Sequence, residues 1–206
     1  MIYIMKSILA YRPLVLSVLF SIGLMMSAQG VWYFGGSDAF GNASNDVAGV
    51  DFNGLTPLSL AGGEGQLASY EGCATLSDNH GKILCYTDGL NVYDQTHQVM
   101  PNGSGLFGSH SSTQSSIIGP MPGRTDAFYI FTNKSLNNTS QVGFNGLSYS
   151  TVDFTLMGNG STCPLGDIVS NEKNIPLVDS TNEKVAIVPH MNGTDYWVIT
   201  QSGKWN

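Results

Sequence analysis

EGCATLSDNHGKILCYTDGLNVYDQTHQVMPNG, residues 71–103, alternates short runs of β-forming residues with tight-turn sequences. Asp-Gly and Asn-x-Gly between apolar runs are hairpin signals, because glycine adopts a positive φ there without steric cost. The stretch therefore predicts an antiparallel meander of three strands, the last of them ended by Pro101-Asn102-Gly103. The expected strands are Cys73–Ser77, Ile83–Thr87 and Leu90–Val99, joined by turns at Asp78–Gly81 and Asp88-Gly89.

A strand that is apolar on both faces occurs four times in the chain. The four segments are Val31–Gly35, Ile83–Thr87, Phe128–Thr132 and Tyr196–Thr200. They begin at residues 31, 83, 128 and 196, at intervals of 52, 45 and 68 residues. Such a strand favours burial on both sides. We therefore expect each of the four to lie in a sheet that is covered on both faces.

The sequences around these strands repeat as well. The preceding runs of small and β-branched residues are Cys73–Leu76, Ser115–Ile118 and Val185–Val188, which lead to turns at Gly81, Gly123 and Gly193. The strands expected to follow are Ala48–Phe52, Gly89–Val92 and Gly146–Tyr149, and the expected edge strands are Pro57–Leu60 and Asn174–Val178. Four-stranded units at spacings of roughly 40–50 residues are typical of a β-propeller.

The expected fold is therefore all-β: an incomplete β-propeller of WD40-like, four-stranded antiparallel blades, with about three to four partial blades present. A β-sandwich with irregular strand lengths is the alternative. Asn137–Asn145 and Met157–Ser170 are expected to be exposed loops that lengthen the last interval. Because the last unit stops after its second strand, we expect the chain to be the N-terminal piece of a longer protein.

Several stretches of the chain also resemble a known family in their order and in their amino-acid sequence. They are WYFG (32–35), AGVDFNG (48–54), residues 71–89, VYDQTHQVMPNGSGLFG (92–108) and SSTQSSIIGPMPG (111–123). They resemble the N-terminal β-propeller region of Bacteroidetes surface proteins that carry PKD-type repeats and a gliding-motility-associated, type IX secretion sorting domain. The resemblance runs from about Trp32 to Thr200. It implies a WD40-like propeller exported to the cell surface, and it brings no catalytic residues.

Residues 1–30 have the pattern of a signal peptide. Lys6 and Arg12 give a basic start, Leu14–Met26 is an apolar run, and Ala28-Gln29-Gly30 offers small residues for cleavage. A membrane anchor is the alternative, although the run is shorter than the roughly 20 residues of a spanning helix. We expect residues 31–206 to form the exported propeller fragment, without a membrane span.

The charge of the chain limits its partners. The formal net charge is −7, and removal of residues 1–30 takes away two basic and no acidic residues, which makes it −9. An acidic chain lacks the basic surface that binds nucleic acid or anionic lipid. The expected partner is therefore a surface protein or a glycan.

The cysteine and histidine pattern predicts no cofactor or metal. Cys73, Cys85 and Cys163 are too few for a disulfide framework. Cys73 and Cys85 lie on neighbouring expected strands, where either a bridge or two buried thiols is consistent with the sequence. No pair has zinc spacing, and no known calcium-loop motif occurs.

The candidate binding residues lie in a polar segment that leads into one of the expected blades. They are His97, His110, Ser111, Ser112, Thr113 and Gln114. Loops of this kind converge at the channel of a propeller, so we expect them to line one rim and take part in binding. The alternative is a solvated loop whose hydroxyl groups satisfy the backbone.

No catalytic constellation stands out in the sequence. The acidic residues fall mostly in turns, namely Asp78, Asp88, Asp94, Asp126 and Asp195, where turn chemistry explains them. The expected function is a non-catalytic cell-surface module for binding or adhesion. A propeller glycoside hydrolase and a spacer that binds nothing are the alternatives.

Overall fold

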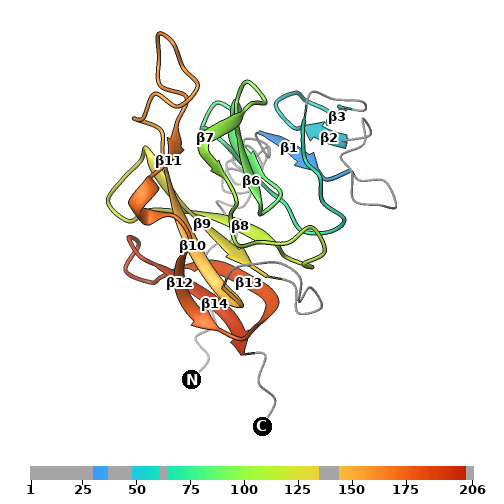
Figure 1. The fold of residues 1–206 in the computed structure, drawn as a ribbon. Helices are drawn as coiled ribbons and strands as arrows, with labels where there is room; N and C mark the ends of the chain where they lie inside the picture. The colour runs from blue at the N-terminus through green and yellow to red at the C-terminus, as the bar shows by residue number, and fades with distance from the viewer. Residues whose placement is uncertain (1–29, 37–47, 61–64, 135–143, 203–206) are drawn as a thin grey trace, which may run out of the picture.

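The computed structural model describes residues 30–36, 48–60, 65–134 and 144–202, and this part of the chain is all-β (Figure 1). It contains strands and a single 3-10 turn, Ser170–Glu172, and no α-helix among these residues. Of the sequence predictions, the signal peptide lies outside the described residues except for Gly30, and most of the loop 137–145 does too.

The strands form four separate antiparallel sheets. The first sheet contains β1 (Val31–Phe34), β2 (Ala48–Asp51) and β3 (Leu58–Ser59). The second sheet contains β4 (Ala74–Ser77), β5 (Ile83–Thr87), β6 (Asn91–Asp94) and β7 (Val99–Ser104). The third sheet contains β8 (Ser116–Pro120), β9 (Ala127–Asn133), β10 (Gly146–Asp153), β11 (Asp167–Ile168) and β12 (Ile175–Asp179). A hairpin of β13 (Thr181–Pro189) and β14 (Tyr196–Ser202) completes the set.

The predicted succession of antiparallel strands is confirmed, but of the four sheets only the second has the predicted four strands. Strands β4, β5, β6 and β7 pair in sequence order, and so do β8, β9 and β10. Strands β11 and β12 both pair with β10, near its two ends. The three predicted turn glycines share one backbone conformation, with φ of 80° at Gly81, 79° at Gly123 and 75° at Gly193. A positive φ of this size is readily adopted by glycine.

Two predicted bounds were wrong. Met157–Ser170, expected to be an exposed loop, contains the buried strand β11, Asp167–Ile168, which pairs with β10. Leu90–Val99 is not one strand, because β6 ends at Asp94 and a turn separates it from β7. The Asp94 carboxylate accepts a hydrogen bond from the backbone of Thr96 at 2.7 Å, which folds the chain back. Pro101 does not end a strand either. It lies inside β7, the edge strand, where its missing N–H removes no ladder bond that the sheet requires.

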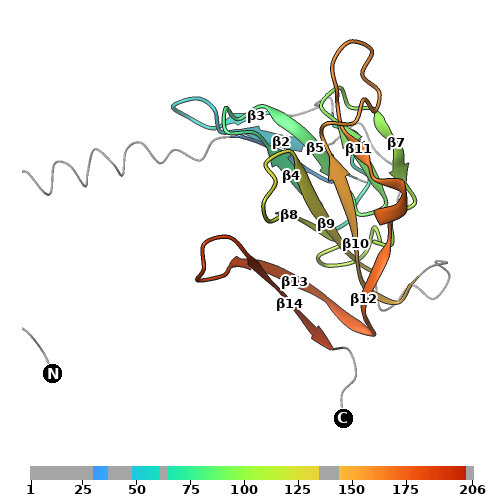
Figure 2. The same cartoon turned by 90° about the vertical axis from the view of Figure 1, so that its left-hand side faces the viewer.

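The sheets lie one against the next: β1 contacts β4, β4 contacts β8, and β8 contacts β13 (Figure 2). A hydrophobic cluster fills each junction. Tyr33 of β1 and Tyr86 of β5 are buried in the first cluster, while Cys85 of β5 and Ile130 of β9 are buried in the second. Phe131 of β9 meets Val185 of β13 in the third. Strands β5 and β9 are therefore covered on both faces, as their sequences predict.

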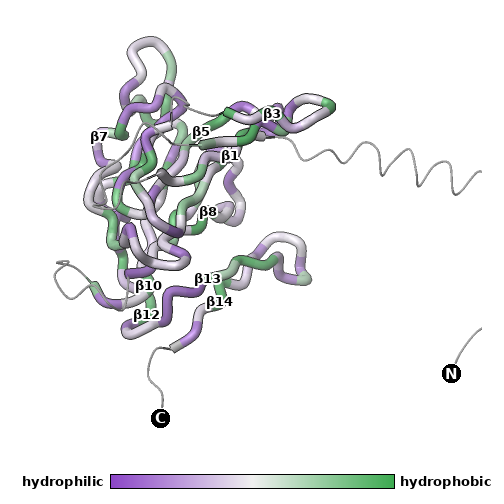
Figure 3. Tube along the Cα trace, turned by 90° about the vertical axis from the view of Figure 1, so that its right-hand side faces the viewer, coloured by the Kyte–Doolittle hydropathy of each residue, from purple (hydrophilic) through white to green (hydrophobic). Residues whose placement is uncertain are grey.

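The two end sheets differ from that prediction. Trp32 and Phe34 of β1 are 52% and 43% exposed, and Trp197 and Ile199 of β14 are 58% and 54% exposed. Within the described residues, no further sheet covers these faces. In the coloured trace of Figure 3, one part of this hairpin is hydrophobic green and the part toward β12 and the C-terminus is hydrophilic purple.

The remaining structural predictions concern thiols and membrane helices. Cys73, Cys85 and Cys163 are all free, so the two cysteines of the second sheet are not bridged. No helix in the described ranges has the length and apolarity needed to cross a membrane.

Candidate functional site

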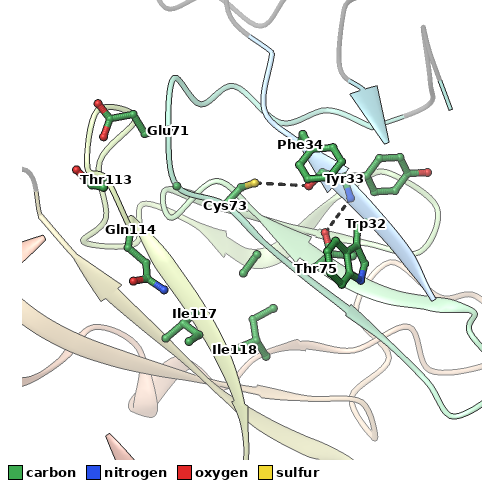
Figure 4. Close-up of a pocket in the computed structure, with 12 residues that line it drawn as sticks. Trp32, Tyr33, Phe34, Glu71, Cys73, Thr75, Thr113, Gln114, Ile117 and Ile118 are labelled. Carbon is green, nitrogen blue, oxygen red and sulfur yellow. Dashed lines mark hydrogen bonds between the residues drawn. The ribbon is translucent and has the colours of Figure 1, made fainter. Parts of the chain in front are cut away.

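A groove of about 460 Å³ lies where β1, β4 and β8 approach one another (Figure 4). Residues 32–34 form one wall, residues 71–75 form the floor, and residues 113–114 and 117–118 form the opposite wall. Its volume falls in the range of about 300–1,000 Å³ that is usual for small-molecule sites. The groove is the candidate functional site.

Side chains of β4 and the residue before it hold the aromatic wall in place. Alternate residues Cys73, Thr75 and Ser77 point at the edge of β1 that is not paired with β2. Thr75 Oγ1 accepts from the Tyr33 N–H at 3.1 Å, and Ser77 Oγ accepts from the Val31 N–H at 3.2 Å. Cys73 Sγ lies 3.5 Å from the Tyr33 carbonyl oxygen and donates to it. A row of side chains therefore takes the place of a neighbouring strand.

The polar wall is held by backbone contacts. The Tyr70 N–H donates to the His110 carbonyl at 3.0 Å, and the Gly72 N–H donates to the Ser112 carbonyl at 3.1 Å. A Cβ atom at Gly72 would collide with the Ser115 nitrogen, so only glycine allows the two segments to approach this closely. The segment predicted to bind is thus fixed beside the start of β4.

Two of the six predicted residues line the groove. The Gln114 side chain accepts from the Val185 N–H at 3.3 Å and turns its amide nitrogen toward the groove (Figure 4). Thr113 donates from its nitrogen and its hydroxyl to the Glu183 carboxylate, at 2.9 and 3.2 Å. One wall of the groove therefore carries exposed aromatic rings, and the other carries side chains that can form hydrogen bonds.

The other four predicted residues do not line the groove. His110 Nδ1 bonds to the Ala68 carbonyl, Ser111 is exposed, and Ser112 is buried. His97 belongs to the turn between β6 and β7, where its Nδ1 lies 3.0 Å from the Tyr86 hydroxyl. Its ring packs against Tyr86 and Tyr33 in the first cluster. None of these four residues lines the groove, and His97 lies on a different element from the other three.

Trp32, Phe34 and Glu71 line the groove and were missed as site residues. The indole of Trp32 packs against the Phe52 ring, with centroids 5.0 Å apart, which fixes its orientation. Trp32 and Phe34 alternate with the buried Tyr33, so the pattern alone would have placed them on one face of β1. Their exposure depends on the neighbouring sheets, and for that the sequence carries no local signal.

The groove has one ionisable carboxylate, that of Glu71, and no Lys, Arg or His among its lining residues. Burial raises the pKa of the Cys73 thiol above its ordinary value, so the thiol is protonated at neutral pH. In the described part of the chain, no cluster of three or more His, Cys, Asp or Glu residues is placed to hold a metal ion. The lining is therefore mainly aromatic, aliphatic and uncharged polar.

The predicted turn role of the acidic residues is confirmed. Asp78 accepts from the His80 N–H at 2.8 Å, and Asp88 accepts from the Leu90 N–H at 2.8 Å. Asp126 pairs with Arg124 at 2.8 Å. These carboxylates stabilise turns and do not enter the groove.

Comparison of the chain with protein-family models, curated proteins and solved structures finds no match.

Proposed function

We propose that the chain is an exported, cell-surface β-propeller module that binds a protein or a glycan in the groove and performs no catalysis. The observation that carries the proposal is the groove itself, with half-exposed Trp32 and Phe34 facing Gln114. Large exposed aromatic side chains in a concave site are typical binding anchors.

The stacking of the sheets supports the propeller arrangement. Each central sheet contributes residues to two hydrophobic clusters, one on either face. The inner strands β4 and β8 lie beside each other, as the first strands of neighbouring blades do around an axis. On this proposal the first sheet and the β13–β14 hairpin are partial blades, and the groove opens beside the axis.

The sequence supports the cell-surface location. Residues 1–30 have the order of basic, apolar and small residues that directs export. The mature charge disfavours nucleic acid and anionic lipid as partners. The family resemblance from Trp32 to Thr200 points to the same location, on the outer membrane exterior.

A glycoside hydrolase is the second candidate function, since propellers also serve as scaffolds for such enzymes. Hydrolysis uses two carboxyl groups on either side of the scissile bond, about 5–9.5 Å apart. Glu71 is the single carboxylate among the described lining residues. The chemistry of the groove therefore favours binding.

A printed array of glycans and extracellular proteins tests the proposed function. The full chain should bind at least one member, and the double variant Trp32→Ala/Gln114→Ala should lose that binding. Trp197→Ala/Gln201→Ala is the matched control, because it removes the same side-chain types from β14. Binding that survives in the groove variant contradicts the proposal. Turnover of chromogenic glycosides that Glu71→Gln abolishes would favour the hydrolase.

A further inference from the structure

We infer that the groove recognises a neutral saccharide. This inference rests on the proposed function, because it names the ligand class of the same groove. Three features carry it: an oriented aromatic wall, an opposite wall with uncharged hydrogen-bonding groups, and the absence of a cation from the described lining.

The aromatic wall suits the face of a sugar ring. Trp32 and Phe34 both project from the same face of β1 and are about half exposed, at 52% and 43%. Contact with Phe52 holds the indole of Trp32 before any ligand arrives, so little side-chain freedom is lost on binding. The face of an aromatic ring carries a partial negative charge. The C–H groups on one face of a pyranose are weakly positive and apolar, so they stack on such a surface.

The opposite wall suits the hydroxyl groups of a sugar. A hydroxyl both donates and accepts hydrogen bonds, so its site needs groups of both kinds. The amide nitrogen of Gln114 can donate, and the Thr113 hydroxyl, whose proton goes to Glu183, keeps a lone pair that can accept. These two residues lie across the floor from Trp32 (Figure 4). A volume of about 460 Å³ leaves room for more than one sugar ring.

The charge of the lining disfavours acidic sugars. An anionic group placed in the groove would find the Glu71 carboxylate and no cationic side chain among the described lining residues. Burial of an unpaired charge is costly. A uronic or sialic acid residue should therefore bind much more weakly than a neutral one.

The edge of β1 disfavours an extended peptide as the ligand. Strand addition needs free backbone groups. The N–H groups of Val31 and Tyr33 are already bonded to Ser77 and Thr75, and Cys73 donates to the Tyr33 carbonyl. A peptide strand would have to displace all three side chains, whereas a saccharide stacks on the rings and leaves them in place.

Titration of the full chain with neutral trisaccharides tests the inference, with tryptophan fluorescence and calorimetry as readouts. The probes are cellotriose, maltotriose and triacetylchitotriose, and tri-galacturonic acid is the anionic comparison. At least one neutral probe should bind, and tri-galacturonic acid should bind about tenfold or more weakly. Trp32→Ala should lower the affinity for the neutral probe by about tenfold or more, as loss of an aromatic anchor does.

Trp197→Ala is the matched control, since it removes an equally exposed tryptophan and should leave affinity unchanged. A urea melt of each variant confirms that it folds. If no neutral probe shows binding that depends on Trp32 at millimolar concentration, the saccharide inference is overturned. The inference is also overturned if tri-galacturonic acid binds more tightly than every neutral probe. The same holds for a synthetic peptide with the sequence of residues 183–190, which covers most of strand β13, if it binds more tightly than every neutral probe.

Failure of the saccharide inference can be distinguished from failure of the proposed function. If the array detects a protein ligand that depends on Trp32 while every saccharide fails, the groove is a binding site and the ligand class is wrong. If no ligand of either class depends on Trp32, the proposed function fails with it.

Discussion

Asp94 ends strand β6 and stabilises the turn to β7, so its removal should destabilise the second sheet. The carboxylate is fully buried. Its Oδ1 accepts from the nitrogen and the hydroxyl of Thr96 at 2.7 and 2.6 Å. Its Oδ2 accepts from Asn159 Nδ2 at 2.8 Å. The same arrangement recurs at the end of β10, where Asp153 accepts from the nitrogen and the hydroxyl of Thr155.

The expected cost of Asp94→Ala follows from these bonds. A hydrogen bond to a charged group contributes about 1.5–3 kcal/mol. The sum over these three bonds and a longer fourth one, from the Gln98 N–H at 3.4 Å, overestimates the loss. Thr96, Gln98 and Asn159 are exposed and can bond to water instead. We expect a loss of about 2–4 kcal/mol in the free energy of unfolding. Asp78→Ala, which removes a half-buried turn carboxylate from the same sheet, should cost about 1 kcal/mol.

Urea unfolding of the three proteins, followed by fluorescence and circular dichroism, measures these differences at constant m-value. If Asp94→Ala costs no more than Asp78→Ala, the reasoning is refuted. The comparison between two carboxylates of one sheet excludes a general effect of net charge.

The effect of Asp94→Ala should depend on pH. Burial favours the protonated acid, but the hydrogen bonds from Thr96 and Asn159 outweigh it and hold the pKa of Asp94 below its ordinary value. A lowered pKa in the folded state adds stability that is fully present above about pH 4, the pKa of the unfolded chain. That stability is lost as the pH falls through this value toward the folded pKa. The difference between wild type and Asp94→Ala should therefore shrink between pH 6 and pH 3, and a difference that grows would contradict the assignment.

Three further predictions concern the core, the thiols and the open edge. Ile130→Ala removes a fully buried side chain between the second and third sheets and should cost about 2–5 kcal/mol, while Leu55→Ala, at a fully exposed site, should change the urea midpoint little. Cys163 is exposed and should react with a thiol reagent in the native protein. Burial raises the pKa of Cys85 to about 12, so this thiol should react only after unfolding; a fast reaction of Cys85 in the native protein would contradict the packing. Strand β14 has an edge unpaired within the described residues and carries exposed Trp197 and Ile199. Sedimentation should therefore show weak self-association that Ile199→Lys reduces and Leu55→Lys does not.

The repeat of strands and turns could be predicted from the sequence because its causes are local. Glycine at 81, 123 and 193 marks the turns through its positive φ. Strands β5 and β9, apolar at successive positions, must bury both faces, and each does so in two different clusters. The boundary after Asp94 was missed because its cause is a side-chain bond to the backbone two residues later. The sequences Asp94-Gln95-Thr96 and Asp153-Phe154-Thr155 would have been the signal for it.

The groove could not be predicted in the same way. Its walls join residues that are about forty or more positions apart, such as Tyr33 and Thr75. Thr113 and Gln114 were identified from a polar segment, yet His97 was grouped with them although its ring packs in another cluster.

The sequence by itself therefore determined most of the strands and turns, since alternation and turn chemistry act over a few residues. Strand β11, and the pairing of both β11 and β12 with β10, came from the tertiary structure. Only the tertiary structure decided which apolar faces are covered and which remain open. Trp32 and Tyr86 both belong to doubly apolar strands, but Tyr86 is buried between sheets and Trp32 lines a groove. Burial is a property of the layers that meet at a residue, and those layers come from distant parts of the chain.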